Sequence, residues 1–365
     1  MKKYKICKIL LVILAIFLCV AFYELLGICV AYKKQPEVSN TTKKETKNGS
    51  WNECSENTER AVIIEKNPEA LLQRVRLIKN AKKEIILSTF AFQSDESGKL
   101  ILGALHDAAD RGVHIRLLVD GMESWIDMEG NPYFYGLSSH ENVEIKLYNK
   151  ANPLKPWKMM GRMHDKYLIA DGKRYILGGR NTYNYFLGDF PGHKNYDRDV
   201  LVVCDEPEKE NSVNQLLEYF ETIWEQEDSG YFHDNKKLAN RKSVKNAVLE
   251  LQNGYQKYFE ENKERICDTD YTDETFETEK IALVSNPIHT GSKEPVVWYQ
   301  LGELMKNAKN RVKIHTPYII CNDMMYNTWE EIAENVSDFS IMTNSVANNG
   351  NPFGAADYAK NRNRI

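Results

Sequence analysis

The stretch that decides the fold runs from residue 162 to residue 186 and reads RMHDKYLIADGKRYILGGRNTYNYF. Six of its residues follow the spacing H-x-K-x4-D-x6-G-G-x-N, namely His164, Lys166, Asp171, Gly178, Gly179 and Asn181. The apolar run from Tyr167 to Ala170 precedes Asp171-Gly172, a turn signal, and Arg174 to Leu177 would return as the next strand. The spacing therefore predicts a β-hairpin that brings the histidine, the lysine and the asparagine together.

These side chains suit a phosphodiester substrate. The imidazole of His164 can attack phosphorus and carry a covalent phosphoryl group. Lys166 lies two residues further on, so it points to the same side of an extended strand and can neutralise phosphate oxygens. Asn181 adds a neutral donor, and Gly178-Gly179 would let a phosphate approach the backbone. A lone His-x-Lys pair on a strand edge is usually only solvated, but six matching positions argue against chance.

The motif resembles the signature of the phospholipase D superfamily, in which Asp171 is one of the signature residues. The continuation GGRN, the aromatic residues Tyr183 to Phe186 and the run Tyr196 to Val200 are similar to the bacterial cardiolipin synthase branch. The resemblance implies metal-independent chemistry without a cofactor. It implies two motifs per active site, in which one histidine forms the phospho-enzyme and the other protonates the leaving alcohol.

The resemblance also implies an acidic partner for the catalytic imidazole, at the start of the strand that follows the motif. Asp199, which precedes the apolar run from Val200 to Val203, is the expected partner, and Asp197 is the alternative. From its place at the turn, Asp171 suits a structural role better, as a cap of the hairpin that supports its neighbours.

Around the motif, helical and strand patterns alternate. Helices are expected over residues 67–80, 98–111 and 212–226, and strands over 85–90, 113–119, 143–148 and 200–203. This alternation predicts an α/β fold, with a mixed sheet flanked by helices. Residues 61–227 would form this first phospholipase D-like repeat, and the charged residues 228–280 would connect it to the next.

The chain then repeats itself over residues 281–365. Leu77 to Lys82 (LIKNAK) returns 227 residues later as Leu304 to Lys309 (LMKNAK), and helix, strand, helix and strand recur over 297–310, 312–316, 324–334 and 339–343. This recurrence predicts a duplicated fold. The same offset would place a second histidine near position 391, beyond Ile365, so we expect an incomplete second repeat in a truncated gene product. The alternatives are a homodimer that combines two single motifs and a non-catalytic remnant.

The N-terminus is expected to anchor the chain in a membrane. A basic head, residues 1–8, precedes an apolar segment, 9–32, which is long enough for a bilayer core of roughly 20 residues. No small-x-small cleavage site follows, so we predict an uncleaved transmembrane helix and not a signal peptide. Residues 33–60 are polar and would form a tether. Lysines lie on both sides of the segment, and we expect the catalytic part outside the cytoplasm.

Outside the motif, the clearest candidate is the basic and apolar stretch from Asn149 to Met160. Trp157 could bind substrate or lipid there, or the stretch could be a surface loop packed by its tryptophan. The net charge of −4 is small and by itself does not imply a polyanion-binding surface. A local basic groove would suffice for nucleic acid, which is not the expected partner. Seven scattered cysteines without a C-x-x-C pair predict no zinc site.

Together these features predict a membrane-anchored phosphatidyltransferase of the cardiolipin synthase type. It would act through a phosphohistidine, with phospholipid and membrane as its partners. The alternatives are a dimeric phosphodiesterase or nuclease with one motif per chain, and an anchored scaffold without activity.

Overall fold

The computed structural model describes residues 2–49, 59–204, 211–233, 235–345, 347 and 352–364. The chain divides into two compact units. Unit 1 contains residues 1–34, 53–283 and 288–292, and unit 2 contains residues 35–52, 284–287 and 293–365.

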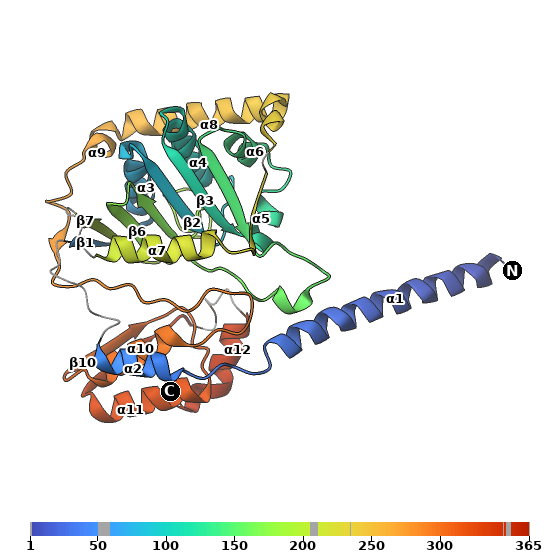
Figure 1. Ribbon diagram of the computed structural model, residues 1–365, viewed down its shortest axis with the longest axis vertical. Coiled ribbons are helices and arrows are strands. Elements are labelled where there is room, and N and C mark those ends of the chain that lie inside the picture. Colours follow the sequence, from blue (N-terminus) through green and yellow to red (C-terminus); the bar gives the residue numbers. More distant parts are fainter. Residues whose placement is uncertain are drawn as a thin grey trace. The chain divides into compact units, whose positions relative to one another are not determined.

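A nine-stranded mixed sheet forms the centre of unit 1 (Figure 1), in the order β8-β4-β3-β2-β5-β6-β7-β1-β9. The strands are β1 (Glu59–Ile64), β2 (Glu84–Thr89), β3 (His114–Asp120), β4 (Val143–Tyr148), β5 (Tyr167–Ala170), β6 (Arg174–Gly178), β7 (Asp199–Cys204), β8 (Ser229–Tyr231) and β9 (Phe276–Glu277). Strands β2, β3 and β4 run parallel to one another, and every other neighbouring pair is antiparallel. The predicted mixed sheet is confirmed.

Helices cover both faces of this sheet, because successive strand residues point to opposite sides. In β5, Leu168 and Ala170 join the core on one face, while Tyr167 and Ile169 join the core on the other. The first face packs against α3 (Asn67–Asn80), α4 (Glu96–Asp110), α6 (Pro132–Ser138) and α8 (Lys242–Glu261). The second face packs against α7 (Ser212–Trp224).

The residues expected to connect the two repeats, 228–280, are instead part of unit 1. Strand β8 extends the sheet beside β4, and α8 packs against α4 and α6. Val244, Ala247, Leu251 and Tyr255 recur at helical spacing and are all buried, so α8 carries an apolar face that needs a core to cover it. Helix α9 (Lys263–Cys267) continues this packing against α3.

Strands β5 and β6 form the predicted hairpin. Asp171 and Gly172 at its tip have φ angles of 54° and 63°. Positive φ at both central residues is the requirement of the tight turn that matches the twist of two antiparallel strands, and Asp-Gly is among the sequences that favour it.

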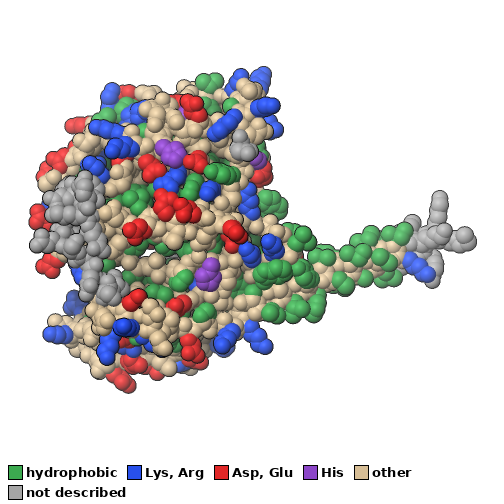
Figure 2. Space-filling model, in the orientation of Figure 1, with side chains coloured by type: hydrophobic (Ala, Val, Ile, Leu, Met, Phe, Trp, Pro, Cys, Tyr) green, Lys and Arg blue, Asp and Glu red, His purple; other side chains and the backbone are tan. Residues whose placement is uncertain are grey.

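Helix α1 (Lys2–Ala31) contains one stretch, Lys8–Ala31, that is long and apolar enough to cross a membrane. Length and composition alone support this, and a signal sequence would pass the same test. Hydrophobic side chains cover most of its visible length (Figure 2). In the segment expected to be a polar tether, Ser39 caps a short helix, α2 (Asn40–Asn48), by accepting from the Thr42 amide. Residues 50–58 of that segment lie outside the described part of the chain, and its last two residues, Glu59 and Arg60, begin β1.

Unit 2 contains a two-stranded parallel sheet with three further helices. The order is α10 (Val296–Lys306), β10 (Arg311–His315), α11 (Asp323–Asn335), β11 (Asp338–Met342) and α12 (Pro352–Asn361). Strands β10 and β11 are parallel, as β2 and β3 are in unit 1. The predicted recurrence of helix, strand, helix and strand is therefore present.

Candidate active site

The carboxyl end of β2 brings together the predicted catalytic side chains. The His164 ring lies edge-on to Phe90, with the ring centroids 4.5 Å apart, and the Lys166 ammonium lies 5.4 Å from the same ring. The side-chain oxygen of Asn181 accepts from the Ala91 amide at 3.3 Å. The pairing explains this, because β5 runs antiparallel to β2 and residues just before β5 must lie beside the end of β2.

Asp120, at the end of the neighbouring strand β3, holds the chain just before His164. One carboxylate oxygen accepts from the Met163 amide at 3.1 Å, and the carboxylate forms an ion pair with Arg162 at 2.7 Å. Arg162 also pairs with Glu123 at 3.0 Å. Asp120 itself is buried. The site thus lies where the carboxyl ends of two parallel strands meet, a usual place for a binding site in α/β folds.

The two central side chains have shifted pKa values. His164 is accessible to solvent, yet the protein around its ring desolvates it, and with help from Lys166 and Arg162 this lowers its pKa to about 4. Lys166 is buried, which lowers its pKa to about 8, although Asp165 and Asp197 oppose the shift. Lys166 also donates to the His164 carbonyl oxygen at 2.6 Å. Near neutral pH the site therefore combines a neutral imidazole with a mainly charged ammonium.

Gly178 and Gly179 leave room for carboxylates of the protein itself. A Cβ added to Gly178 would lie 2.1 Å from an oxygen of Asp199, and one added to Gly179 would lie 2.1 Å from an oxygen of Asp197. The Gly178 amide also donates to the Lys166 carbonyl oxygen at 3.2 Å. The close approach that these glycines allow is therefore to Asp197 and Asp199, which differs from the predicted approach of a phosphate.

Asp199 is placed away from its expected role as the partner of His164. Its carboxylate forms ion pairs with Arg74 at 2.9 Å and Arg180 at 3.2 Å, and all three side chains are buried. Two arginines are needed because a buried carboxylate without counter-charges would be strongly unfavourable. Asp197, the alternative, lies against Gly179 and influences Lys166.

Asp171 lies at the opposite end of the hairpin from His164. Its carboxylate accepts from the amides of Lys82, Lys83 and Glu84, at 2.9, 2.7 and 3.0 Å. The four residues of β5 separate the two ends by roughly 13 Å. Asp171 is therefore a cap on the start of β2, as its place at the turn suggested, and contacts no reacting group.

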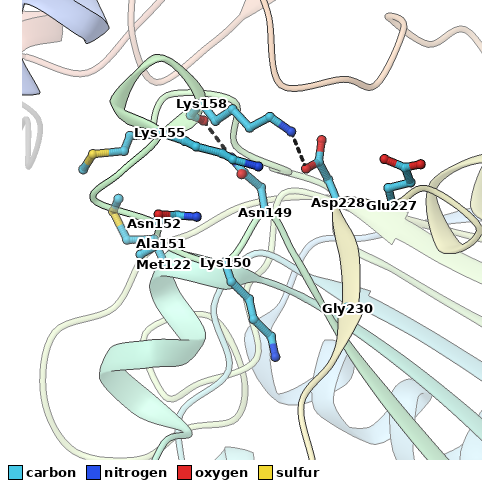
Figure 3. A pocket seen from close by; sticks show the side chains of 11 residues that line it. Met122, Asn149, Lys150, Ala151, Asn152, Lys155, Lys158, Glu227, Asp228 and Gly230 are labelled. Carbon is cyan, nitrogen blue, oxygen red and sulfur yellow. Dashed lines mark hydrogen bonds and ion pairs between the residues drawn. The ribbon is translucent and has the colours of Figure 1, made fainter.

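Trp157 belongs to η2 (Pro156–Lys158), in the loop between β4 and β5, and its side chain is 45% exposed. This loop borders a hollow beside α5 (Gly121–Asp127), seen from close by in Figure 3. Figure 3 shows Lys155 and Lys158 on one side of the hollow and Asp228 opposite, bound to Lys158. The hollow includes none of His164, Lys166 and Asn181.

Three residues of the site had no role in the sequence-based prediction: Phe90, Asp120 and Arg162. A signal for Asp120 was present, because it is the acidic residue that ends a strand and is followed by glycine. No local pattern marks Phe90, whose role depends on strand pairing. In the described ranges, no group of three or more His, Cys, Asp or Glu side chains could hold a metal ion.

Comparison with known proteins agrees with this geometry. Residues 74–224 match the family model described as the cardiolipin synthase, phospholipase D-like domain. These residues form a phospholipase D-like domain of the cardiolipin synthase type. The matched range begins inside α3 and ends with α7, so it contains the hairpin and the site at the end of β2.

Relatives of this domain occur in several bacteria. An uncharacterised protein of Helicobacter pylori is 27% identical over 315 residues, which are 79% of this chain and 59% of that protein. Cardiolipin synthase C of Escherichia coli is 29% identical over 171 residues, covering 43% of this chain and 34% of the relative. The chain thus spans less than two thirds of the length of these relatives. The crystal structure of phosphatidylserine synthase from Haemophilus influenzae has the same fold, with 16% identity and a TM-score of 0.58, over 89% of this chain and 72% of that one.

Proposed function

We propose that this protein is a membrane-anchored phosphatidyltransferase of the phospholipase D type, which acts on phospholipids through a phosphohistidine at His164. The observation that carries the proposal is the meeting of His164, Lys166 and Asn181 around Phe90 and Ala91. The phospholipase D-like domain over residues 74–224 and the apolar helix Lys8–Ala31 support it.

In the proposed reaction, the neutral imidazole of His164 attacks the phosphorus of a phosphodiester. A nitrogen–phosphorus bond forms, the bond from phosphorus to the leaving alcohol breaks, and the leaving oxygen takes a proton from water. A hydroxyl group of a second lipid, or water, then attacks the phosphohistidine and gives its proton to solvent, while the nitrogen–phosphorus bond breaks and releases His164. The low pKa of His164 supports this role, since it leaves the ring unprotonated near neutral pH.

Neighbouring side chains would hold the phosphate in place. The ammonium of Lys166 and the amide nitrogen of Asn181 would bind non-bridging oxygens, whose charge grows in the transition state. Asp197, which lies against Gly179 and interacts with Lys166, would be the carboxylate that supports the site in place of Asp199. Asp120 and Arg162 would fix the backbone on which His164 stands.

The test is a search for the covalent intermediate. The full-length chain, in vesicles of phosphatidylglycerol labelled with ³²P, is quenched with base, since phosphohistidine survives base and is cleaved by acid. We expect a labelled adduct in the wild type, none in His164→Asn, and an unchanged amount in His315→Asn, an exposed control in unit 2. An adduct of equal size in His164→Asn would contradict the proposal.

A dimeric phosphodiesterase is the second candidate, because the 365 residues contain one H-x-K-x4-D motif. A dimer would supply two histidines to one reaction, one to attack and one to protonate the leaving alcohol. Turnover per chain should then rise with protein concentration and follow the dimer fraction measured by light scattering. A monomer with constant turnover per chain would exclude this candidate.

A further inference from the structure

The loop that connects β4 to β5 carries an exposed mixture of apolar and basic side chains. We call residues 150–160 the foot. Leu154, Trp157 and Met160 are 76%, 45% and 56% exposed. Lys150, Lys155 and Lys158 lie between and beside them. Large apolar side chains exposed among lysines are typical of segments that lie at a membrane surface.

The foot packs directly against the apolar helix α1 within unit 1. The Tyr23 hydroxyl donates to the Leu154 carbonyl oxygen at 3.0 Å. Gly27 lies so close that an added Cβ would be 2.5 Å from the Pro156 ring. In Figure 1, α1 leaves the rest of unit 1 beside this loop. The foot is thus adjacent to the chain segment that would enter a membrane.

Further contacts fix the end of α1. The Tyr32 hydroxyl donates to the Thr290 carbonyl oxygen at 2.6 Å, and the Ser292 hydroxyl donates to the Ala31 carbonyl oxygen at 3.2 Å. Gly161, which follows the foot, packs on Thr290, since an added Cβ would lie 2.5 Å from its Cα. The end of α1 and the end of the foot therefore both contact residues 290–292. This shared contact limits how far the helix can move relative to the foot.

The side of α1 that faces the foot is also its polar side. Glu24 is the one acidic residue between Lys8 and Ala31. It is half-buried, as are Gly27, Ile28 and Ala31, which follow it at helical spacing. Acidic groups in membrane helices face protein in preference to lipid, because hydrocarbon does not solvate them. The foot therefore contacts, through Gly27, the side of α1 that also carries its acidic residue.

The contact lies at the depth of the bilayer surface. From Tyr23 to Ala31 an α-helix rises about 12 Å. The stretch Lys8–Ala31 has 24 residues and is about 36 Å long, against a hydrocarbon core of about 30 Å. If α1 spans this core with its excess length of about 6 Å at the end beside the foot, the contact between Tyr23 and Leu154 lies about 6 Å inside the edge of the hydrocarbon. Amphipathic segments insert to about this depth, roughly 5–10 Å.

We propose that the foot docks into the bilayer surface beside α1. Leu154, Trp157 and Met160 enter the boundary with the acyl chains, and Lys155 lies among the anionic headgroup phosphates. Lys158 and Lys150 hold the loop to the protein, through Asp228 at 2.7 Å and the Tyr231 carbonyl oxygen at 2.5 Å. The inference rests on the part of the proposed function that places α1 across a bilayer. It adds a second contact, which sets the orientation of unit 1 on the lipid surface.

The experiment measures the depth of single side chains in the full-length chain. An environment-sensitive fluorescent amino acid replaces Leu154, Leu18 or Phe276, one at a time, and the protein is reconstituted into vesicles of phosphatidylcholine and phosphatidylglycerol. Bromine atoms on the acyl chains then quench any probe in contact with them. Phe276 is the matched control, because it is 73% exposed but lies on β9, at the opposite edge of the sheet from β8 and β4.

We expect brominated lipid to quench the probes at Leu154 and at Leu18, in the middle of α1, and to leave the probe at Phe276 bright. Quenching at Leu18 without quenching at Leu154 would overturn the foot and leave the anchor intact. Absence of quenching at both sites would overturn the anchor and, with it, the inference. Equal quenching at Leu154 and Phe276 would show non-specific adsorption to the vesicles and would also overturn it.

Discussion

Lys166 holds an ammonium group in a buried position beside a second basic group. Burial lowers its pKa to about 8, and burial together with Lys166 and Arg162 lowers the pKa of His164 to about 4. Both shifts disfavour the charged form, and in the folded state Lys166 makes one hydrogen bond to the His164 carbonyl oxygen. Groups with such shifts cluster at functional sites, where substrate compensates for the unfavourable environment.

These pKa values predict the pH dependence of the reaction. The rate should rise as the pH passes about 4, because His164 loses its proton, and fall above about 8, because Lys166 loses its charge. The measurement is kcat/KM for lipid hydrolysis between pH 3.5 and 10, with vesicle binding measured at each pH. In Lys166→Arg the alkaline limb should move to higher pH, since arginine stays protonated. An alkaline limb unchanged in that variant would contradict the role of Lys166.

The sequence predicted the arrangement of the candidate catalytic residues better than that of the residues that support them. The spacing of His164, Lys166 and Asn181 was sufficient to predict that a hairpin brings them together, because strand periodicity and turn chemistry are local. The environment of Asp199 was not predictable, because its partners Arg74 and Arg180 come from segments far apart in the chain. The ring of Phe90 enters the site only through the pairing of β2 with β5.

At the scale of the elements, the two ends of the hairpin β5–β6 differ in role. Its tip stabilises the sheet, and its open end lies beside the candidate catalytic residues. Asp171 at the tip accepts from the first amide of β2 and from the two amides just before it, while His164 lies at the other end. The sequence motif therefore contains residues of two kinds. Asp171 stabilises the sheet, and His164 is the candidate catalytic residue.

Asp171→Ala should therefore destabilise the fold without changing the chemistry. Loss of three amide partners should lower the free energy of unfolding by about 2–3 kcal/mol. Activity per folded molecule should stay within about twofold of wild type, because the carboxylate lies roughly 13 Å from the site. Denaturant unfolding and activity at low temperature measure the two effects. Asp197→Asn is the comparison variant, and it should show the reverse pattern. A large loss of activity in fully folded Asp171→Ala would contradict this division.

Helix α8 shows that residues beyond the match to the family model complete the first core. Gly103 of α4 allows close contact, because an added Cβ would lie 2.7 Å from both the Leu251 carbonyl oxygen and the Tyr255 Cβ. The sequence predicted a helix here but not its packing partner, since an apolar face does not specify the surface that covers it.

The two helix glycines make a matched pair of variants. Gly103→Ala should lower the free energy of unfolding by about 1–3 kcal/mol, because α4 and α8 must move apart. Gly254→Ala, on α8 with no atom within 4 Å of the added Cβ, should raise it by about 0.5–1 kcal/mol through higher helix propensity. Thermal or urea unfolding of both variants provides the check. A neutral Gly103→Ala would show that α8 does not pack on α4.

At the scale of the whole molecule, the proposed function places the chain in a membrane through α1. Lys8–Ala31 is the one helix in the described part of the chain with the length and composition for this. Helix α1 has exposed apolar side chains around most of its circumference, which in water would be unfavourable over such an area.

The anchor predicts that the full-length protein stays in the membrane pellet after washing with alkaline carbonate. Lysines at Leu14 and Leu18 should each cost about 2.5–3.5 kcal/mol in the bilayer centre, so the double variant should move to the soluble fraction. Lysines at two exposed positions of unit 1, Leu249 and Phe276, should leave the protein in the pellet. An N-terminal tag that is lost from the mature protein would identify a cleaved signal sequence and contradict the anchor.

Strand β2 is held at both ends by the same hairpin. Asp171 binds the amides at its start, and the residues just past its end, Phe90 and Ala91, contact His164 and Asn181. The six residues of β2 therefore fix the distance between the contacts of Asp171 and the proposed nucleophile, His164. Insertion or deletion of one residue inside β2 would move the aromatic ring by roughly 3.3 Å and turn every side chain beyond the change to the opposite face. Variation in length among proteins that keep this chemistry should therefore collect in the loops and spare this strand.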